Sequence, residues 1–143
     1  MSITKNEGHY FLRIGWGPTD GLHVPLTKVP AVTLNRNAQS TPVPFEFTLE
    51  NCTIGASFWF QFTTGLDGEE WSQVTTTGGT NAAIRIQNST HDDVILGDGT
   101  EVYPIVSGSR TFHFFAVVEK EHGKISVIPG EFTGMVNIDI TYQ

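Results

Sequence analysis

The sequence predicts an all-β fold of the sandwich type. Apolar residues recur at every second position through most of the chain, and β-branched and aromatic residues dominate those positions. Turn residues are frequent, with Gly 15 and Pro 7, and they separate the alternating runs at short intervals. We expect one domain, residues 1–143, with roughly nine or ten short strands.

The N-terminal third is expected to hold three of these strands. Alternate apolar residues form two runs: Tyr10, Leu12, Ile14 and Trp16, then Leu22, Val24 and Leu26. Residues 17–21 contain glycine, proline and aspartate and break the alternation between the runs. Pro25 suggests an edge position for the second strand, because proline cannot donate to a ladder. Val32 and Leu34 predict a third, short strand before a polar loop at 35–41, and no helix is expected.

The rest of the chain continues the same pattern. Further strands are expected around six sets of apolar residues: Phe45 to Leu49, Phe58 to Phe62, Ile84 with Ile86, Val94 with Leu96, Phe112 with Phe114, and Ile125 with Val127. Residues 65–68 read as a turn and residues 75–80 as a polar loop. The three phenylalanines of the run 58–62 share one face, so we interpret them as a core stripe with Trp59 on the opposite face.

Composition excludes several classes of function. The net charge of -7 argues against a nucleic-acid or anionic-membrane partner. No apolar stretch approaches the roughly 18 residues that a membrane-spanning helix needs. Residues 1–8 lack the apolar region of a signal peptide, so the numbering of a secreted protein would start at a mature or engineered terminus.

No motif predicts catalysis, a cofactor or a metal site. His91, Asp92, Asp93 and Asp98 lie close in sequence, but their residue types are typical of a polar hairpin connection. The adjacent pair at residues 69–70 would point to opposite faces of a strand, and the histidines are scattered without paired spacing. We therefore expect neither catalytic residues nor metal ligands, and no enzyme.

The C-terminal segment carries the strongest functional signal. Its alternate positions hold Phe132, Val136, Ile138, Ile140 and Tyr142, with Gly134 in the same row. A strand would place this row on one face and mostly polar residues on the other. The strand would run to the last residues of the chain, where termini are usually frayed unless something holds them.

A glycine fourteen residues from the end, Gly130, followed by alternating apolar residues and a penultimate tyrosine, resembles the C-terminal signature of chaperone–usher pilus subunits. Three further segments resemble the strands of that family in the same order: residues 43–52, which end in Cys52, residues 83–99, and residues 111–118. The resemblance implies an immunoglobulin-like, pilin-type sandwich that is incomplete and is closed by a donated strand. It also implies a structural subunit, or the pilin domain of an adhesin, that mediates cell adhesion.

The partners that the resemblance implies are a periplasmic chaperone, an outer-membrane usher and neighbouring pilus subunits, with a host-cell receptor as a further candidate. The location would be the fimbrium at the cell surface, reached through the periplasm. The predicted chaperone and donor-strand groove is lined by Gly130, Phe132, Val136, Ile138, Ile140 and Tyr142. A strand added to an open sheet edge supplies main-chain hydrogen bonds as well as apolar contacts.

Two features depart from the family pattern. Cys52 is the single cysteine, whereas relatives commonly pair the equivalent residue with an upstream cysteine. Residues 2–9 contain one large aliphatic residue, Ile3, and make a poor donor strand. An extension could have been removed, the subunit could sit at the pilus tip, or the chain could be the C-terminal half of an adhesin. Alternatively, the chain could complete itself with the strand that contains Tyr10, Leu12, Ile14 and Trp16.

The competing interpretation is a stand-alone sandwich lectin or adhesin that binds host glycans directly. The aromatic run 58–62, with Trp71 nearby, motivates it, because aromatic faces stack on sugar rings. A lectin would be a soluble monomer when expressed alone, whereas a pilus subunit would be recovered with its chaperone.

Overall fold

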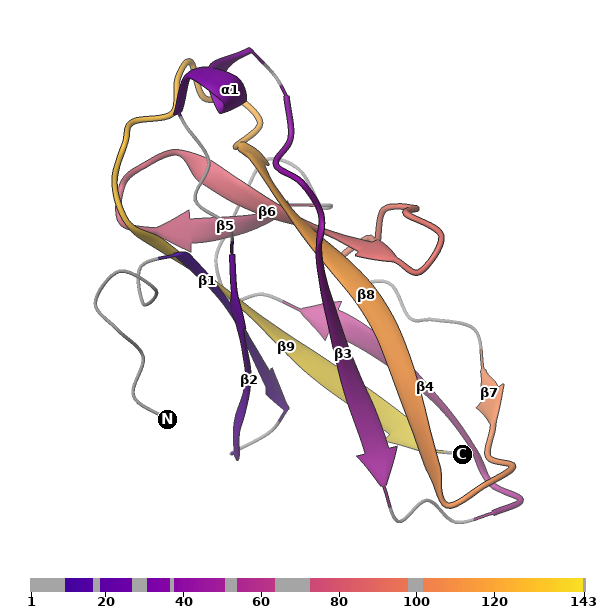
Figure 1. The fold of residues 1–143 in the computed structure, drawn as a ribbon. Coiled ribbons are helices and arrows are strands. Elements are labelled where there is room, and N and C mark those ends of the chain that lie inside the picture. Colours follow the sequence, from indigo (N-terminus) through magenta and orange to yellow (C-terminus); the bar gives the residue numbers. More distant parts are fainter. Residues whose placement is uncertain are drawn as a thin grey trace.

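A computed structural model describes residues 10–16, 19–26, 31–36, 38–50, 54–63, 73–97 and 102–142. The all-β class is confirmed: the described residues form nine strands and one short helix (Figure 1). In chain order the elements are β1 (Tyr10–Trp16), β2 (Thr19–Pro25), α1 (Ala31–Asn35), β3 (Val43–Glu50), β4 (Ser57–Thr63), β5 (Gln73–Thr77), β6 (Ala82–Asn88), β7 (Tyr103–Pro104), β8 (Ser109–Lys120) and β9 (Phe132–Tyr142).

The strands form two layers that are joined through β5. One layer contains β3, β8, β6 and the first part of β5, which pairs with β6 at Val74 and Ile84. The other contains β2, β1, β9, β4 and β7, and β5 reaches it where Thr76 pairs with Gly134. Figure 1 shows β3 and β8 in front of β9 and β4. Every ladder between described strands is antiparallel except that of β1 with β9, which is parallel.

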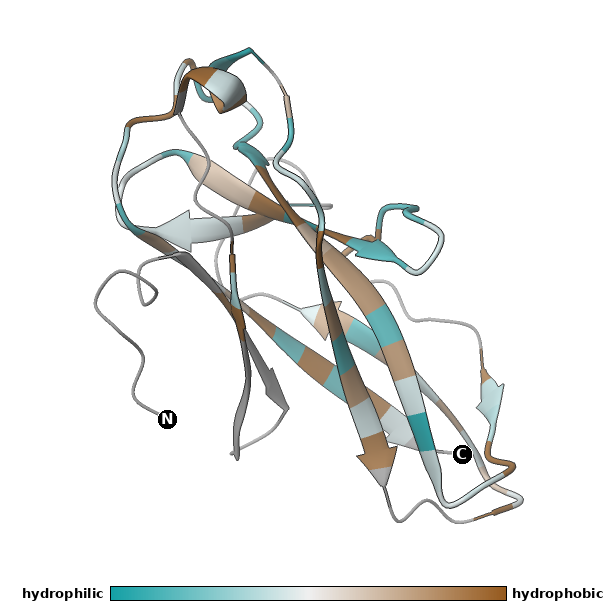
Figure 2. Ribbon diagram, viewed as in Figure 1, coloured by the Kyte–Doolittle hydropathy of each residue, from teal (hydrophilic) through white to brown (hydrophobic). Residues whose placement is uncertain are grey.

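The core between the layers is rich in aromatic rings. Phe58, Phe60 and Phe62 alternate along β4 and are each 1% exposed. Their rings meet those of β8: the centroid of Phe60 lies 4.9 Å from that of Phe112, and Phe62 lies 5.1 Å from Phe114. Figure 2 shows the corresponding alternation of hydrophobic and hydrophilic residues along β8 and β9. The prediction of a core stripe in β4 is confirmed, since rings this deeply buried cannot present a face to a sugar.

The expectation of a strand at Val32 and Leu34 was wrong, because these residues lie in α1. Two apolar residues two positions apart fit a strand, but here Leu34 is buried and Val32 is exposed. The helix ends at Asn35, whose side chain bonds the backbone of Val127 in both directions. The Val127 amide donates to Asn35 Oδ1 at 2.6 Å, so a tertiary contact overrides the local strand preference. The described part of the chain holds no helix long and apolar enough to cross a membrane.

Four other expectations about strands and turns need correction. Ile125 and Val127 lie in an irregular segment, held by side-chain and backbone hydrogen bonds rather than by a ladder. Residues 73–77, predicted in part as polar loop, form β5, in which Gln73 and Thr75 are buried. Beyond β6 a single isolated bridge joins Gln87 to Asp93, and no strand forms over residues 94–96. Residues 17–21 were expected to break the alternation between two strands, but β2 already begins at Thr19.

Candidate functional site

The candidate site is β9, whose two faces differ sharply in exposure. Along the inner row Phe132, Gly134, Val136 and Ile138 are buried and Ile140 is partly buried. On the outer face Met135 is 45% exposed, and Asn137 and Asp139 are exposed as well. The strict alternation follows from the two-residue period of a strand with one face on the core. The side chain of Tyr142 lies outside the described part of the chain, although its backbone belongs to β9.

One side of β9 is occupied along almost its whole length. β4 runs antiparallel to the second half, from Thr63 opposite Asn137 to Phe58 opposite Tyr142. The Thr63 hydroxyl donates to Asp139 Oδ2 at 3.1 Å, which adds a polar contact on the exposed face. β5 covers the first half at Thr133 and Gly134.

The other side of β9 is occupied over its first half. β1 runs parallel to it, in a register that begins with Tyr10 opposite Phe132 and ends with Gly15 opposite Asn137. Beyond Asn137, the backbone from Ile138 to Tyr142 has no neighbour on this side among the described strands, and this part of β9 is here called the open edge. Unpaired backbone donors and acceptors at such an edge are a template for another strand.

Gly134 allows Ile84 and Val74 of the opposite layer to approach β9 closely. It lies opposite Leu12 of β1, whose side chain is fully buried. A Cβ atom on Gly134 would come within 2.5 Å of Ile84 Cδ1 and 3.4 Å of Val74 Cγ1. The inner row therefore lacks a side chain at this one position because Ile84 fills the space.

The start of β9 is fixed by a tight turn after β5. Gly78 has φ +115 and a Cβ atom there would lie 2.2 Å from the carbonyl oxygen of Glu131. Only glycine fits such a backbone conformation against another backbone. Gly130, which the sequence assigned to the groove, is exposed and lies just before the strand. Sequence reasoning missed Gly78, although its place in a Gly-Gly pair is a recognisable turn signal.

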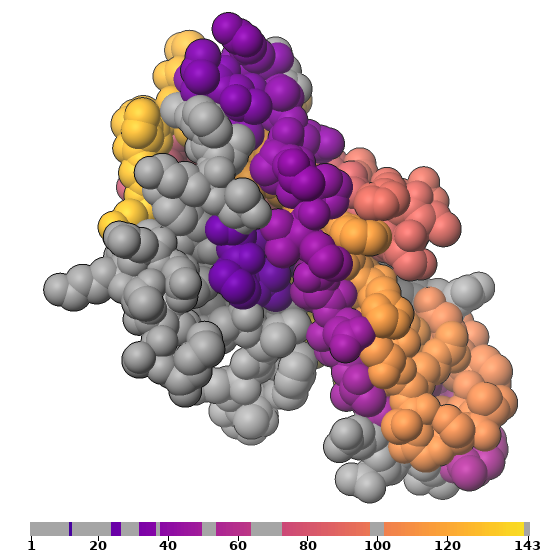
Figure 3. All heavy atoms as spheres, in the orientation of Figure 1, coloured from indigo at the N-terminus to yellow at the C-terminus, as the bar shows by residue number. Residues whose placement is uncertain are grey.

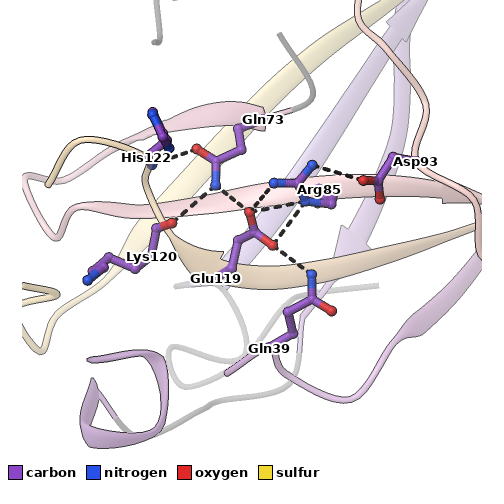
Figure 4. A network of polar contacts seen from close by, with 7 residues as sticks. All are labelled: Gln39, Gln73, Arg85, Asp93, Glu119, Lys120 and His122. Atoms are coloured by element: carbon purple, nitrogen blue, oxygen red, sulfur yellow. Dashed lines mark hydrogen bonds and ion pairs between the residues drawn. The ribbon is translucent and has the colours of Figure 1, made fainter. Parts of the chain in front are cut away.

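The opposite layer carries a network of polar contacts that sequence reasoning also missed (Figure 4). Arg85 of β6 forms a bidentate pair with Glu119 of β8, with Nε–Oε1 at 3.0 Å and Nη2–Oε2 at 2.6 Å. Gln39 and Gln73 donate to the same carboxylate, and Arg85 Nη1 lies 3.1 Å from Asp93 Oδ2. The Gln73 side chain also accepts from the His122 amide at 2.8 Å. The network thus ties β5, β6 and β8 together on their outer face.

The environment of Glu119 shifts its acidity. Burial opposes ionisation of this carboxyl, but hydrogen bonds from Arg85, Gln39 and Gln73, together with the charge of Arg85, outweigh the burial. The net effect holds the pKa of Glu119 below its usual value. Both oxygens of Glu119 and all three nitrogens of the Arg85 guanidinium have protein partners in this network, which is the arrangement of a structural clamp (Figure 4).

The acidic turn after β6 is held by local contacts. Asn88 Oδ1 accepts from the amides of Thr90 and Asp92, both at 3.0 Å, which is the turn chemistry expected from these residue types. Asp93 is engaged by Arg85. Among the described residues no three His, Cys, Asp or Glu side chains gather as metal ligands would. Several residues weighed in the sequence lie outside the described part: Cys52, Glu69, Glu70, Trp71 and Asp98.

The chain is similar to pilus proteins in sequence. A family model described as "Fimbrial protein" matches residues 16–143. The F7-2 fimbrial protein of Escherichia coli is 30% identical over 132 residues, covering 81% of this chain and 70% of the relative. The PRS fimbrial major pilin protein of Escherichia coli is 29% identical over 127 residues, covering 81% of this chain and 77% of the relative.

Solved pilus structures share the fold. The P pilus rod subunit PapA superposes with a TM-score of 0.73 at 23% identity, over 82% of this chain and 89% of that one. A chaperone–usher pilus gives a TM-score of 0.70 at 24% identity, over 84% of this chain and 80% of that one. From the family match and these sequence relatives, the chain belongs to the fimbrial protein family and is a structural subunit of a surface fimbria.

Proposed function

We propose that this subunit is assembled by adding an extended segment of another protein to the free side of β9. A periplasmic chaperone would supply the segment first, and a neighbouring subunit would replace it at the outer-membrane usher. The observation that carries the proposal is the half-open edge, since β1 pairs with β9 up to Asn137 and no described strand pairs with Ile138–Tyr142 on that side.

Strand addition would use both the backbone and the inward side chains of this edge. The free backbone groups of the second half of β9 would pair with the incoming main chain. The side chains of Ile138 and Ile140 point inward beside the edge, so alternate side chains of the added strand would enter the same apolar layer. Each large side chain that becomes fully buried would contribute about 1.5–3 kcal/mol. Tyr142 and Gly130 would form the two ends of this groove wall.

β1 would act as the chain's own occupant of the first half of the groove. Its residue Leu12 is fully buried opposite Gly134, which is the packing expected of a self-complementing strand. Tyr10, Ile14 and Trp16 belong to the same alternating row of the sequence as Leu12. Assembly is then a competition, in which the incoming strand must replace the contacts of β1 as well as fill the free edge.

Adhesion would be a property of the assembled fimbria. A fimbria displays its subunits at the cell surface, and a host-cell receptor would meet them there. The sequence relatives are pilins by name, which supports a structural role for this chain in the fibre and leaves receptor contact to the assembled surface.

Co-expression in the periplasm tests the proposal. The full chain would be directed to the periplasm with and without the chaperone of its fimbrial system. We expect a one-to-one complex with the chaperone, captured through a tag on the chaperone, and poor recovery without it. The Ile138→Asp variant should not be captured, whereas Asn137→Ser, on the exposed face of the same strand, should be captured normally. A chain that is recovered equally well as a monomer with or without chaperone would contradict the proposal.

A further inference from the structure

Two apolar surfaces lie at opposite ends of the molecule, one in the segment before β9 and one near the C-terminal end of β9, where Phe58 pairs with Tyr142. The first, here called the projecting pole, is formed by Ile125 and Ile128 in the segment between β8 and β9. Ile125 is 95% exposed and Ile128 is 54% exposed. The segment is nevertheless held in place: the Ile128 amide donates to the Thr80 carbonyl at 2.8 Å, and Asn81 Nδ2 donates to the Ser126 carbonyl at 3.0 Å. These exposed side chains are therefore presented from a fixed backbone.

The second surface, here called the hollow pole, lies beside β7. Val106 is 78% exposed and lines a hollow of about 220 Å³ whose wall also includes Phe58 and Ile105. Ile54, which is 68% exposed, precedes Gly55, whose amide bonds the Ile105 carbonyl. Backbone hydrogen bonds between residues 55–56 and Ile105, at 3.0 and 2.9 Å, hold its two sides together. Arg110 closes one side, with its guanidinium 4.5 Å from the ring centroid of Tyr103. The hollow is thus already formed in the subunit.

The two poles are far apart. Figure 1 shows α1 and the segment before β9 at one end and β7 at the other, and Figure 3 shows the atoms of these segments at opposite ends of the surface. Figure 2 shows hydrophobic residues in both. A contact between two different surfaces at opposite ends of a subunit repeats from copy to copy, and it gives an open filament unless the rotation between copies closes a ring.

Charge favours contact at these two surfaces between copies of the chain. Two copies with a net charge of -7 each repel one another over most of their surfaces. Residues 102–110 contain one charged side chain, Arg110, and residues 124–130 contain one, Lys124. Neither segment contains a carboxylate of its own, although Glu121 pairs with Lys124 at 3.8 Å and Glu131 follows residue 130, so the poles carry less negative charge than the chain as a whole.

We propose that the projecting pole of one copy packs into the hollow pole of the next copy of the same chain. Ile125 and Ile128 would lie against Val106 and the mouth of the hollow. The proposal rests on the proposed function in taking the chain to be a repeating subunit, but the contact is separate from strand addition at β9. It would be a weak, reversible contact that stiffens the fibre between neighbours already joined by a strand.

The proposed contact can be tested with substitutions of exposed side chains, because these replacements leave the core intact. Ile125→Asn removes the projection, Val106→Asn removes the apolar mouth of the hollow, and Ile95→Asn is the matched control at an exposed position in neither pole. Sedimentation equilibrium of the purified full chain, over a wide concentration range, reports self-association. We expect reversible, open-ended association of the wild type and the control, and association roughly tenfold or more weaker in each pole variant.

A mixture of the two pole variants gives the sharpest outcome. Ile125→Asn keeps an intact hollow and Val106→Asn keeps an intact projection, so the equimolar mixture should form dimers and no longer species. Association that is equal in all variants, or that persists on dilution, would assign the contact to strand exchange at β9 and overturn this proposal alone. A wild-type chain that stays monomeric at every concentration, combined with weaker chaperone capture of Val106→Asn, would assign the hollow to the chaperone and also overturn it.

Discussion

The two halves of β9 are held in different ways. The first half, up to Asn137, has β1 on one side and β5 on the other, and its start is fixed by the turn at Gly78. The second half has β4 on one side and, among the described strands, none on the other. A single strand therefore joins an anchored segment to an open edge. In the proposed assembly the incoming strand would pair with the open half first and would then replace β1 along the first half.

The pairing of β1 with β9 has features that would allow another strand to replace β1. β1 and β9 lie near opposite ends of the sequence and pair in parallel, the less stable of the two ladder types per residue. The ladders of the other layer are antiparallel and include β3 with β8 over eight residue pairs. The difference suggests that local opening is easiest at the β1 side of β9, where strand addition is proposed.

The largest effect should come from a charge in the inner row of the open half. Ile138 is 3% exposed, so Ile138→Asp would bury a carboxylate without a partner and destabilise the fold by more than about 4 kcal/mol. Ile140→Asp should act in the same direction but more weakly, because Ile140 is only partly buried. Asn137→Ser should stay within about 0.5 kcal/mol. Urea unfolding measures the three variants, and equal losses at positions 137 and 138 would contradict the assigned faces.

Next in size should be the loss of the anchor that β1 provides. Leu12→Ala removes a fully buried side chain and should destabilise the isolated chain by about 2–5 kcal/mol. If β1 gives way to a donated strand, the same substitution should have little effect on the stability of the chaperone complex. Thermal unfolding of the free chain and of the complex makes the comparison. An equal loss in both states would show that β1 stays in place during assembly.

Sequence patterns predicted the strands whose two faces differ, and they failed where distant contacts decide the structure. The inner rows of β4 and β9 were evident because a strand with one buried face has a two-residue period. Val32 and Leu34 gave the same signal but form α1, since Asn35 is fixed by Val127, which lies far along the chain. β5 was missed in part because Gln73 and Thr75 are polar, and their burial depends on neighbours that a local pattern cannot reveal.

The candidate site was only partly visible for the same reason. The C-terminal alternation and the family resemblance pointed to β9 and to the stretch that forms β1. The register that joins Leu12 to Gly134, and the end of that pairing at Asn137, could not be derived, because parallel pairing between chain ends has no local turn that fixes it. The clamp of Arg85 and Glu119 was likewise invisible, since its members are far apart in sequence.

A smaller effect should follow from disturbing the turn that fixes the first half of β9. Gly78→Ala combines a φ of +115 with a Cβ atom 2.2 Å from the Glu131 carbonyl oxygen, and should destabilise the chain by about 2–3 kcal/mol. Gly79→Ala is the matched control: its φ is +71 but the space around it is open, so about 1 kcal/mol is expected. Hydrogen exchange should quicken at residues 132–135 in Gly78→Ala. Similar stability losses in both variants would show that the contact with Glu131 contributes nothing.

The smallest effect should lie in the other layer, and it should be present at neutral pH and disappear in acid. Interactions with Arg85, Gln39 and Gln73 lower the pKa of Glu119 in the folded chain. A carboxylate with a lowered folded pKa stabilises the fold above its unfolded pKa, and this contribution is lost as the pH falls through the folded pKa. The wild type should thus keep this stability between pH 7 and about 5 and lose it below about 4.5.

Glu119→Gln should be less stable at pH 7 by about 1.5–3 kcal/mol, since the hydrogen bonds it loses are to a charged group. Urea unfolding of both chains as a function of pH measures their difference, which should shrink in acid. Hydrogen exchange at the β9 edge should be the same in the wild type and in Glu119→Gln, because Glu119 lies in the other layer. A stability difference that stays constant down to pH 3 would show that the charge of Glu119 does not stabilise this layer.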